Sequence, residues 1–130
     1  MKFIGLLLIL LMGWSAQAKI ILRIDCVENR STSMEYKNGK VAGKVSKSEK
    51  PVHLSLVVED DNTATLLGNA GTSKLKHLGF MYFTESTGSG NKTFFRIIKQ
   101  GNKYVVYHMK AYDLMGAVSY TTAYLCTNKT

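Results

Sequence analysis

The sequence predicts an all-β domain, folded as a small up-and-down antiparallel β-barrel of about eight strands. Two observations lead to this prediction. Short apolar runs alternate with turn-forming segments throughout the chain after residue 18, whereas helical periodicity is missing. In addition, one cysteine lies near each end of the strand series. A meander of this many strands has two open edges, and closure into a barrel removes them. A two-sheet β-sandwich is the alternative.

Five strands are expected in the first half of the chain, at residues 19–27, 32–37, 40–45, 52–59 and 63–67. Asn38-Gly39 predicts a tight hairpin turn, because both residues tolerate positive φ. A polar loop that ends at Pro51 follows the third strand. The fourth strand alternates apolar and polar residues, which is typical of a strand with one buried face.

Four more strands are expected in the second half, at residues 74–85, 92–99, 103–112 and 117–127. Loops are predicted over residues 68–73, 86–91 and 113–116, and Gly101-Asn102 marks a turn. Large apolar residues occupy both faces of the first of these strands. We therefore interpret Gly79 as a β-bulge that shifts its register.

Residues 1–18 have the features of a cleaved secretory signal peptide. Lys2 gives a positive start, an apolar stretch follows, and Ala16-Gln17-Ala18 fits a small-x-small cleavage site. The stretch is shorter than the roughly 20 residues that span a bilayer as a helix. We therefore expect export to the periplasm or secretion, a single domain at residues 19–130, and no membrane-spanning segment after cleavage. Loss of Lys2 leaves a net charge of +7.

Cys26 and Cys126 are the two cysteines of the chain, and they lie near the ends of the first and last predicted strands. An even number of cysteines in an exported chain indicates a disulfide. Such a bond requires the two Cα atoms to lie within about 7 Å of each other. The first and last strands are then neighbours, as a closed barrel requires.

Side-chain alternation extends this prediction to the interior. Counting back by twos from Cys126 places Tyr124 and Tyr120 on the same strand face as the disulfide, which we expect to point inward. Buried tyrosine hydroxyls need hydrogen-bond partners. The two tyrosines are therefore candidate ligand-binding residues in an internal cavity. A packed core is the alternative, because small barrels generally fill their interior with side chains.

The sequence contains no catalytic, metal-binding or cofactor-binding motif. The three histidines, His53, His77 and His108, lack metal-ligand spacing such as H-x-x-x-H. Two cysteines cannot form a Cys₄ zinc site, and their pairing leaves no catalytic thiol. Gly88-Ser89-Gly90 lacks the spacing of a nucleophile elbow. We therefore expect a protein that is not an enzyme and that holds no metal or cofactor.

Five lysines within 14 residues form the most basic part of the chain: Lys37, Lys40, Lys44, Lys47 and Lys50. Such a group suits contact with an anionic lipid, a polysaccharide or an acidic protein surface. Nucleic acid is a poorer candidate partner, because we expect export and because no aromatic residue lies among these lysines after Tyr36. The alternative is a solvated surface that keeps the protein soluble.

A small exported barrel closed by one end-to-end disulfide resembles lipocalin-like domains and periplasmic lysozyme inhibitors in general plan. The resemblance implies a barrel that carries a small apolar ligand, or one that inhibits a secreted enzyme. The lipocalin G-x-W motif is missing, since the single tryptophan, Trp14, lies in the leader. A net charge of +7 opposes an inhibitor of a basic lysozyme. No residue role is transferred from either group.

The leading functional prediction is an exported, non-enzymatic binding module that contacts anionic envelope or extracellular material through its lysine-rich hairpin and loop. The alternatives are a lipocalin-like carrier of a small apolar ligand in the interior, and a protein inhibitor of a secreted enzyme. The carrier needs a hollow interior, whereas the other two do not.

Overall fold

The computed structural model describes residues 18–86, 92–112 and 118–130, and all regular elements in these ranges are β-strands. They are β1 (Ile20–Lys37), β2 (Lys40–Ser46), β3 (His53–Glu59), β4 (Ala64–Gly68), β5 (Gly71–Gly79), β6 (Tyr82–Ser86), β7 (Lys92–Gln100), β8 (Lys103–Tyr112) and β9 (Val118–Asn128). Within these ranges no helix is long and apolar enough to cross a membrane. The predicted signal peptide lies outside the described residues except for Ala18, as do the predicted loop 86–91 beyond Ser86 and the turn 113–116.

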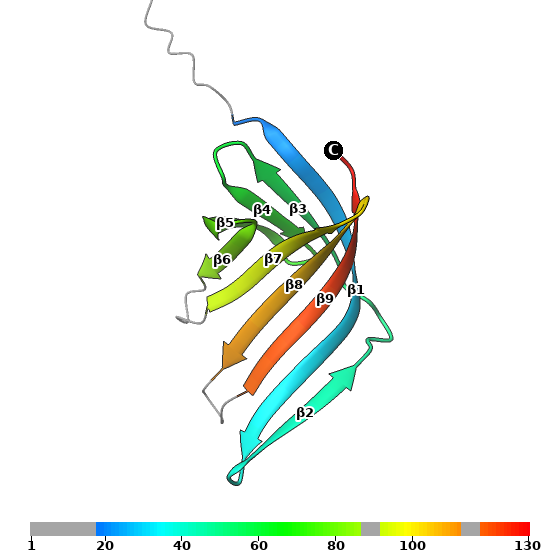
Figure 1. The fold of residues 1–130 in the computed structure, drawn as a ribbon, viewed down its shortest axis with the longest axis vertical. Helices are drawn as coiled ribbons and strands as arrows, with labels where there is room; N and C mark the ends of the chain where they lie inside the picture. The colour runs from blue at the N-terminus through cyan, green and yellow to red at the C-terminus, as the bar shows by residue number, and fades with distance from the viewer. Residues whose placement is uncertain (1–17, 87–91, 113–117) are drawn as a thin grey trace, which may run out of the picture.

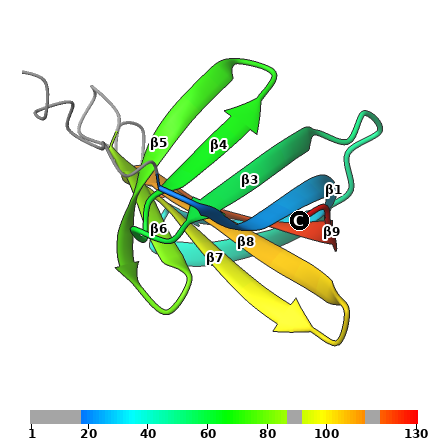
Figure 2. The same ribbon diagram turned by 90° about the horizontal axis from the view of Figure 1, so that it is seen from above.

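Eight strands close into an antiparallel barrel, which confirms the predicted fold and excludes the sandwich. The strand order is β1-β3-β4-β5-β6-β7-β8-β9, and β9 pairs back onto β1. Figure 2 shows this arrangement from above, with β1 between β3 and β9. β2 is an additional strand that pairs with β1 outside the closed ring.

β1 is one continuous strand of 18 residues, where the sequence predicted two strands. Its first half pairs with β3 from Ile20 to Val27, and its second half pairs with β2 from Ser31 to Lys37. β9 runs beside both halves and bridges a β-bulge between Glu28 and Arg30. The polar residues that were expected to end the strand therefore form a bulge instead. The second half of β1 and β2 form an extension, which projects downward in Figure 1.

The predicted single strand at residues 74–85 is wrong, because the chain turns within it. β5 ends at Gly79, and Phe80 and Met81 form a turn before β6, with φ of 39° and 57°. Large residues rarely adopt positive φ, so these two carry no turn signal in the sequence. Their apolar character made a turn look like the interior of a strand. The predicted Asn38-Gly39 turn, in contrast, is confirmed by φ of 52° and 76°.

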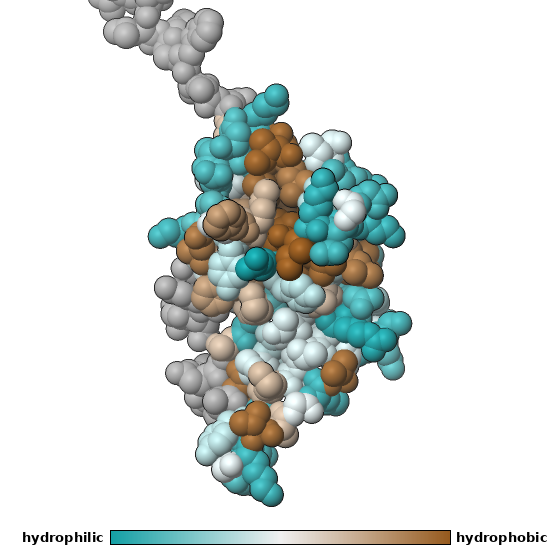
Figure 3. Space-filling model, viewed as in Figure 1, coloured by the Kyte–Doolittle hydropathy of each residue, from teal (hydrophilic) through white to brown (hydrophobic). Residues whose placement is uncertain are grey.

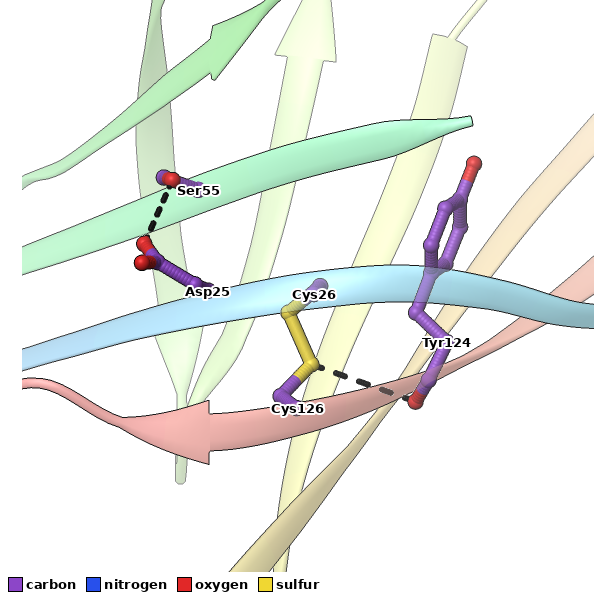
Figure 4. Close-up of a disulfide and its surroundings, with 5 residues drawn as sticks. All are labelled: Asp25, Cys26, Ser55, Tyr124 and Cys126. Atoms are coloured by element: carbon purple, nitrogen blue, oxygen red, sulfur yellow. Dashed lines mark hydrogen bonds between the residues drawn. A yellow bond between two sulfur atoms is a disulfide. The ribbon is translucent and has the colours of Figure 1, made fainter. Parts of the chain in front are cut away.

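The hydrophobic core fills the end of the barrel at which β1 begins. Its fully buried side chains include Ile24, Leu56, Val58, Phe83, Phe95 and Val106. The predicted disulfide is confirmed: Cys26 and Cys126 are joined and directly paired across β1 and β9, with Cα atoms 4.0 Å apart (Figure 4). Asp25 lies on the opposite face of β1, where it accepts a 2.6 Å hydrogen bond from Ser55 Oγ.

Candidate functional site

A cavity of about 670 Å³ opens at the other end of the barrel. The turn between β4 and β5, the start of β3 and the second half of β8 all contribute to its wall. Leu54, Leu66 and Phe95 give this wall an apolar part. The barrel interior is therefore packed at one end and holds a cavity at the other, while ligand binding in that cavity stays a prediction.

Strand β9 supplies one side of the cavity. Tyr120, Thr122 and Tyr124 line it, and they follow the alternation that starts at Cys126. Tyr124 is buried, whereas Tyr120 is 44% exposed near the opening. Thr122 Oγ1 is hydrogen bonded to Ser31 Oγ on β1 at 2.9 Å. Both tyrosines named from the sequence thus line one cavity, while their role in ligand binding stays a prediction.

The environment of Tyr124 keeps its phenol protonated. Burial raises the pKa of the hydroxyl, and the nearby carboxylate of Glu28 raises it further. A neutral phenol can both donate and accept a hydrogen bond. Figure 4 shows the ring beside the disulfide that links β1 and β9. Tyr124 therefore places a neutral polar group where the filled part of the barrel meets the cavity.

His108 and Phe95 form a stacked pair across β8 and β7, with ring centroids 4.1 Å apart and planes inclined by 8°. Both residues line the cavity. Burial lowers the pKa of His108 to about 4, and the positive charge of Lys110 contributes further. The imidazole is consequently neutral at physiological pH, with one nitrogen that donates a hydrogen bond and one that accepts.

Two buried polar atoms of the cavity wall have no hydrogen-bond partner among the described residues: Thr93 Oγ1 and His108 Nε2. Thr93 is only 6% exposed. It pairs directly with Lys110, two residues from His108 on β8, so Thr93 and His108 are diagonal neighbours on the inner face. Such neighbours lie roughly 7–8 Å apart, within reach of one small bound group. An unsatisfied buried polar atom costs about 1–3 kcal/mol.

Charged residues flank Thr93 on both neighbouring strands. Glu85 on β6 and Lys110 on β8 each pair directly with Thr93, and both line the cavity. Glu85 Oε1 accepts a hydrogen bond of 3.2 Å from Ser73 Oγ on β5. The cavity wall therefore presents a carboxylate, a hydroxyl and an ammonium group side by side. No group of three or more His, Cys, Asp or Glu side chains within the described ranges is placed to hold a metal ion.

All five lysines named from the sequence are exposed. Lys37 pairs with Lys40 near the tip of the β1–β2 extension, and Lys44 pairs with Ser33, so these three share one face. Lys47 and Lys50 follow in the segment between β2 and β3. Ser33 also pairs with Tyr120, which shows that this lysine face continues the inner face of the barrel. The structure thus brings Lys44 and Tyr120 to the same side of the cavity mouth.

The sequence alone did not identify Thr93, Glu85, His108 and Lys110 as a group. Each was expected in a strand, but alternation within a strand does not show which residues of other strands lie beside it. The disulfide was the sequence feature that could have helped. Cys126 points inward, Thr122 lies on the same face of β9, and Thr122 pairs with His108, which pairs with Phe95. That step requires the pairing register, which the sequence does not contain.

The chain was compared with protein-family models, with curated proteins and with solved structures, and it matches none of them. The features that characterise the cavity are therefore its own. They are the inward residues of β6 to β9, the two buried atoms without partners and the charged residues at the mouth.

Proposed function

We propose that this protein is an exported, non-catalytic binding protein that takes a small organic ligand into the open end of its barrel. The observation that supports this proposal is the cavity of about 670 Å³, whose wall includes two residues with a buried, unpartnered polar atom, Thr93 Oγ1 and His108 Nε2. Both atoms are oriented by strands that the core and the disulfide hold in place. A rotation of either side chain toward the cavity would let a polar ligand atom bond to it.

The size and lining of the cavity support the same proposal. A volume of about 670 Å³ lies within the roughly 300–1,000 Å³ range of small-molecule pockets. Val52, Leu54 and Leu66 offer apolar contact, while Thr93 and His108 carry polar groups that would orient a ligand. This combination of an apolar wall with few polar groups is typical of sites that orient an organic ligand.

Export is supported by two independent features. The first is the leader-like segment at residues 1–18, and the second is the disulfide between Cys26 and Cys126. Disulfides persist in the periplasm and outside the cell, and they are rare in the cytosol. We therefore propose that the protein meets its ligand in an oxidising compartment.

The proposal is tested with N-phenyl-1-naphthylamine, an uncharged apolar dye whose fluorescence rises in apolar surroundings. We expect saturable one-site binding to the disulfide-bonded protein. Ser73→Phe adds volume to the cavity wall and should weaken dye binding about tenfold or more, because it removes the space that the dye needs. Thr72→Phe is the matched control, since Thr72 is the exposed neighbour that does not line the cavity.

Both variants should remain folded, as thermal unfolding followed by circular dichroism would show. The control should bind the dye within about twofold of the wild-type affinity, which is the scatter expected of a surface change. Absence of saturable dye binding to the folded wild-type protein, or equal binding by both variants, would refute a ligand site in the cavity.

A further inference from the structure

The strand pairs place six polar residues in one row across the inner face, at the level of the cavity mouth. From β2 through β1, β9, β8 and β7 to β6, the row consists of Lys44, Ser33, Tyr120, Lys110, Thr93 and Glu85. Paired strands lie about 4.8 Å apart, so each side chain is next to its partner in the row. The last four members line the cavity, and the first two continue it onto the extension.

Charge is distributed unevenly along this row. Lys110 lies between Tyr120 and Thr93, whereas Glu85 is two strands away from it, at about 10 Å. Lys44 is on the far side of Tyr120, exposed and on a flexible side chain that reaches several ångströms. Within the row, the β8–β9–β1–β2 side therefore carries two lysines and the single carboxylate stands at the other end, while Glu35 lies two residues beyond Ser33 on the same face of β1.

The next row inward is uncharged. It runs through Ser46, Ser31, Thr122, His108, Phe95 and Phe83 on the same six strands. Its imidazole is neutral because burial lowers the pKa of His108 to about 4. Polarity therefore changes with depth, from lysines at the mouth, through a row of hydroxyl, imidazole and phenyl groups, to Leu54 at the level of the disulfide.

We propose that the ligand of this cavity is an anionic amphiphile, with its acidic head group at Lys110 and Tyr120 and its apolar chain against Val52, Leu54 and Leu66. The proposal rests on the function proposed above and specifies the ligand class for the same site. Lys44 adds a second positive charge on the head-group side. A charge-assisted hydrogen bond from Lys110 is stronger than one between neutral groups, so it selects an anion over an uncharged head.

Three ligands with the same ten-carbon chain test this ligand class: decanoate, 1-decanol and decyltrimethylammonium. Each is titrated calorimetrically into the disulfide-bonded protein, below its micelle-forming concentration. We expect decanoate to bind at least tenfold more tightly than decanol and the ammonium compound to bind most weakly. If decanol and decanoate bind equally, the anionic head group is refuted while the proposed binding function stands. If none of the three ligands binds and the dye does not bind either, both proposals fail.

Two matched lysine variants locate the head group. Lys110→Ala removes a positive charge from the cavity, and Lys103→Ala removes one at the β7–β8 turn, at the other end of the barrel. We expect Lys110→Ala to weaken decanoate binding about tenfold and to leave decanol binding within twofold. Lys103→Ala should change neither. An equal loss in both variants would show attraction to the net charge alone and would overturn the assignment.

A last comparison separates a free amphiphile from the surface of an anionic bilayer. The Lys37→Ala/Lys40→Ala double variant removes charge from the tip of the extension, outside the cavity. We expect this variant to bind decanoate within twofold of wild type. The contradicting result has two parts. The double variant would lose decanoate binding as completely as Lys110→Ala does, and it would also lose binding to phosphatidylglycerol vesicles, which Lys110→Ala would still bind. The anion site would then be the extension, and the cavity assignment would be wrong.

Discussion

The two ends of the barrel are built from the same strands, but one end is packed with apolar side chains and the other encloses a partly polar cavity. At the filled end, inward residues such as Ile24, Val58 and Phe83 are almost completely buried. At the open end, the inward residues include Thr93 and Lys110. Strands β3 to β9 thus contribute buried residues to the core at one end and cavity-lining residues at the other.

β6 to β8 show this change within a few residues. Phe83 is followed by Glu85 on β6, Ile97 and Phe95 lead to Thr93 on β7, and Val106 leads through His108 to Lys110 on β8. Each step of two residues stays on the same face of the strand. The cavity therefore arises from a change of residue type along continuous strands, and no separate domain is needed to form it.

The β1–β2 extension differs from both ends, since all seven residues of β2 are exposed. Its outward face carries Val41 and Val45, which are 68% and 62% exposed. Figure 3 shows apolar residues gathered over the upper part of this view, whereas the lower extension carries separate apolar residues among hydrophilic ones. The extension therefore contributes little to the core, and we expect stability to depend on the filled end.

The largest effect should come from a cavity at the filled end. Phe83→Ala should lower the free energy of unfolding by about 3–5 kcal/mol, because it deletes a fully buried aromatic ring. Phe80→Ala provides the control: Phe80 is 96% exposed at the β5–β6 turn, so its loss should change stability by less than about 0.5 kcal/mol. Urea unfolding of both variants measures the difference. Similar values for the two would contradict a filled end that carries the stability.

The disulfide should have the next largest effect. A Cys26→Ala/Cys126→Ala variant should lose about 2–5 kcal/mol, because the bond closes a chain segment with a sequence separation of 100 residues. Wild-type protein kept reduced during urea unfolding should behave like the double variant. A loss below about 1 kcal/mol would mean that the β1–β9 pairing closes the barrel without help from the sulfur atoms.

The smallest of these effects concerns the open end and depends on pH. The pKa of His108 is about 4 in the folded protein, below its ordinary value of 6.5, so between these values the unfolded chain binds more protons. The contribution of His108 is thus fully present above about pH 6.5 and is lost as the pH falls toward 4. It amounts to at most about 3 kcal/mol.

Urea unfolding at several pH values between 7.5 and 4 measures this loss. His108→Phe keeps an aromatic ring against Phe95 and has no titrating group, so its stability should fall less over the same range. Parallel pH profiles for wild type and variant would show that His108 is solvated, and the wall of the cavity would then be more open than the structure indicates.

Much of the fold follows from local patterns in the sequence. Alternation with a period of two gave most strands, and Asn38-Gly39 gave a turn because its backbone needs positive φ. The same local reasoning failed where a turn used Phe80 and Met81, whose side chains favour strands. It also failed at Glu28 to Arg30, where pairing with β9 carries β1 through a polar segment.

The candidate site could be predicted only in part. Tyr120 and Tyr124 follow from Cys126 by counting along one strand, and the structure places both at the cavity. Thr93 and His108 could not be paired in the same way, since they belong to different strands. Likewise, the lysines could be found as a group, but their position on a continuation of the inner face could not.

The sequence by itself determined that this chain is all-β and which residues of each strand share a face. It also determined that a disulfide between its two cysteines can link the first strand to the last. Tertiary structure decided where the barrel ends, that β2 lies outside it, and which polar residues meet at its mouth. The physical reason is range. Alternation and turn geometry act over a few neighbouring residues, whereas register and closure depend on the combined burial and hydrogen bonding of strands far apart in the chain.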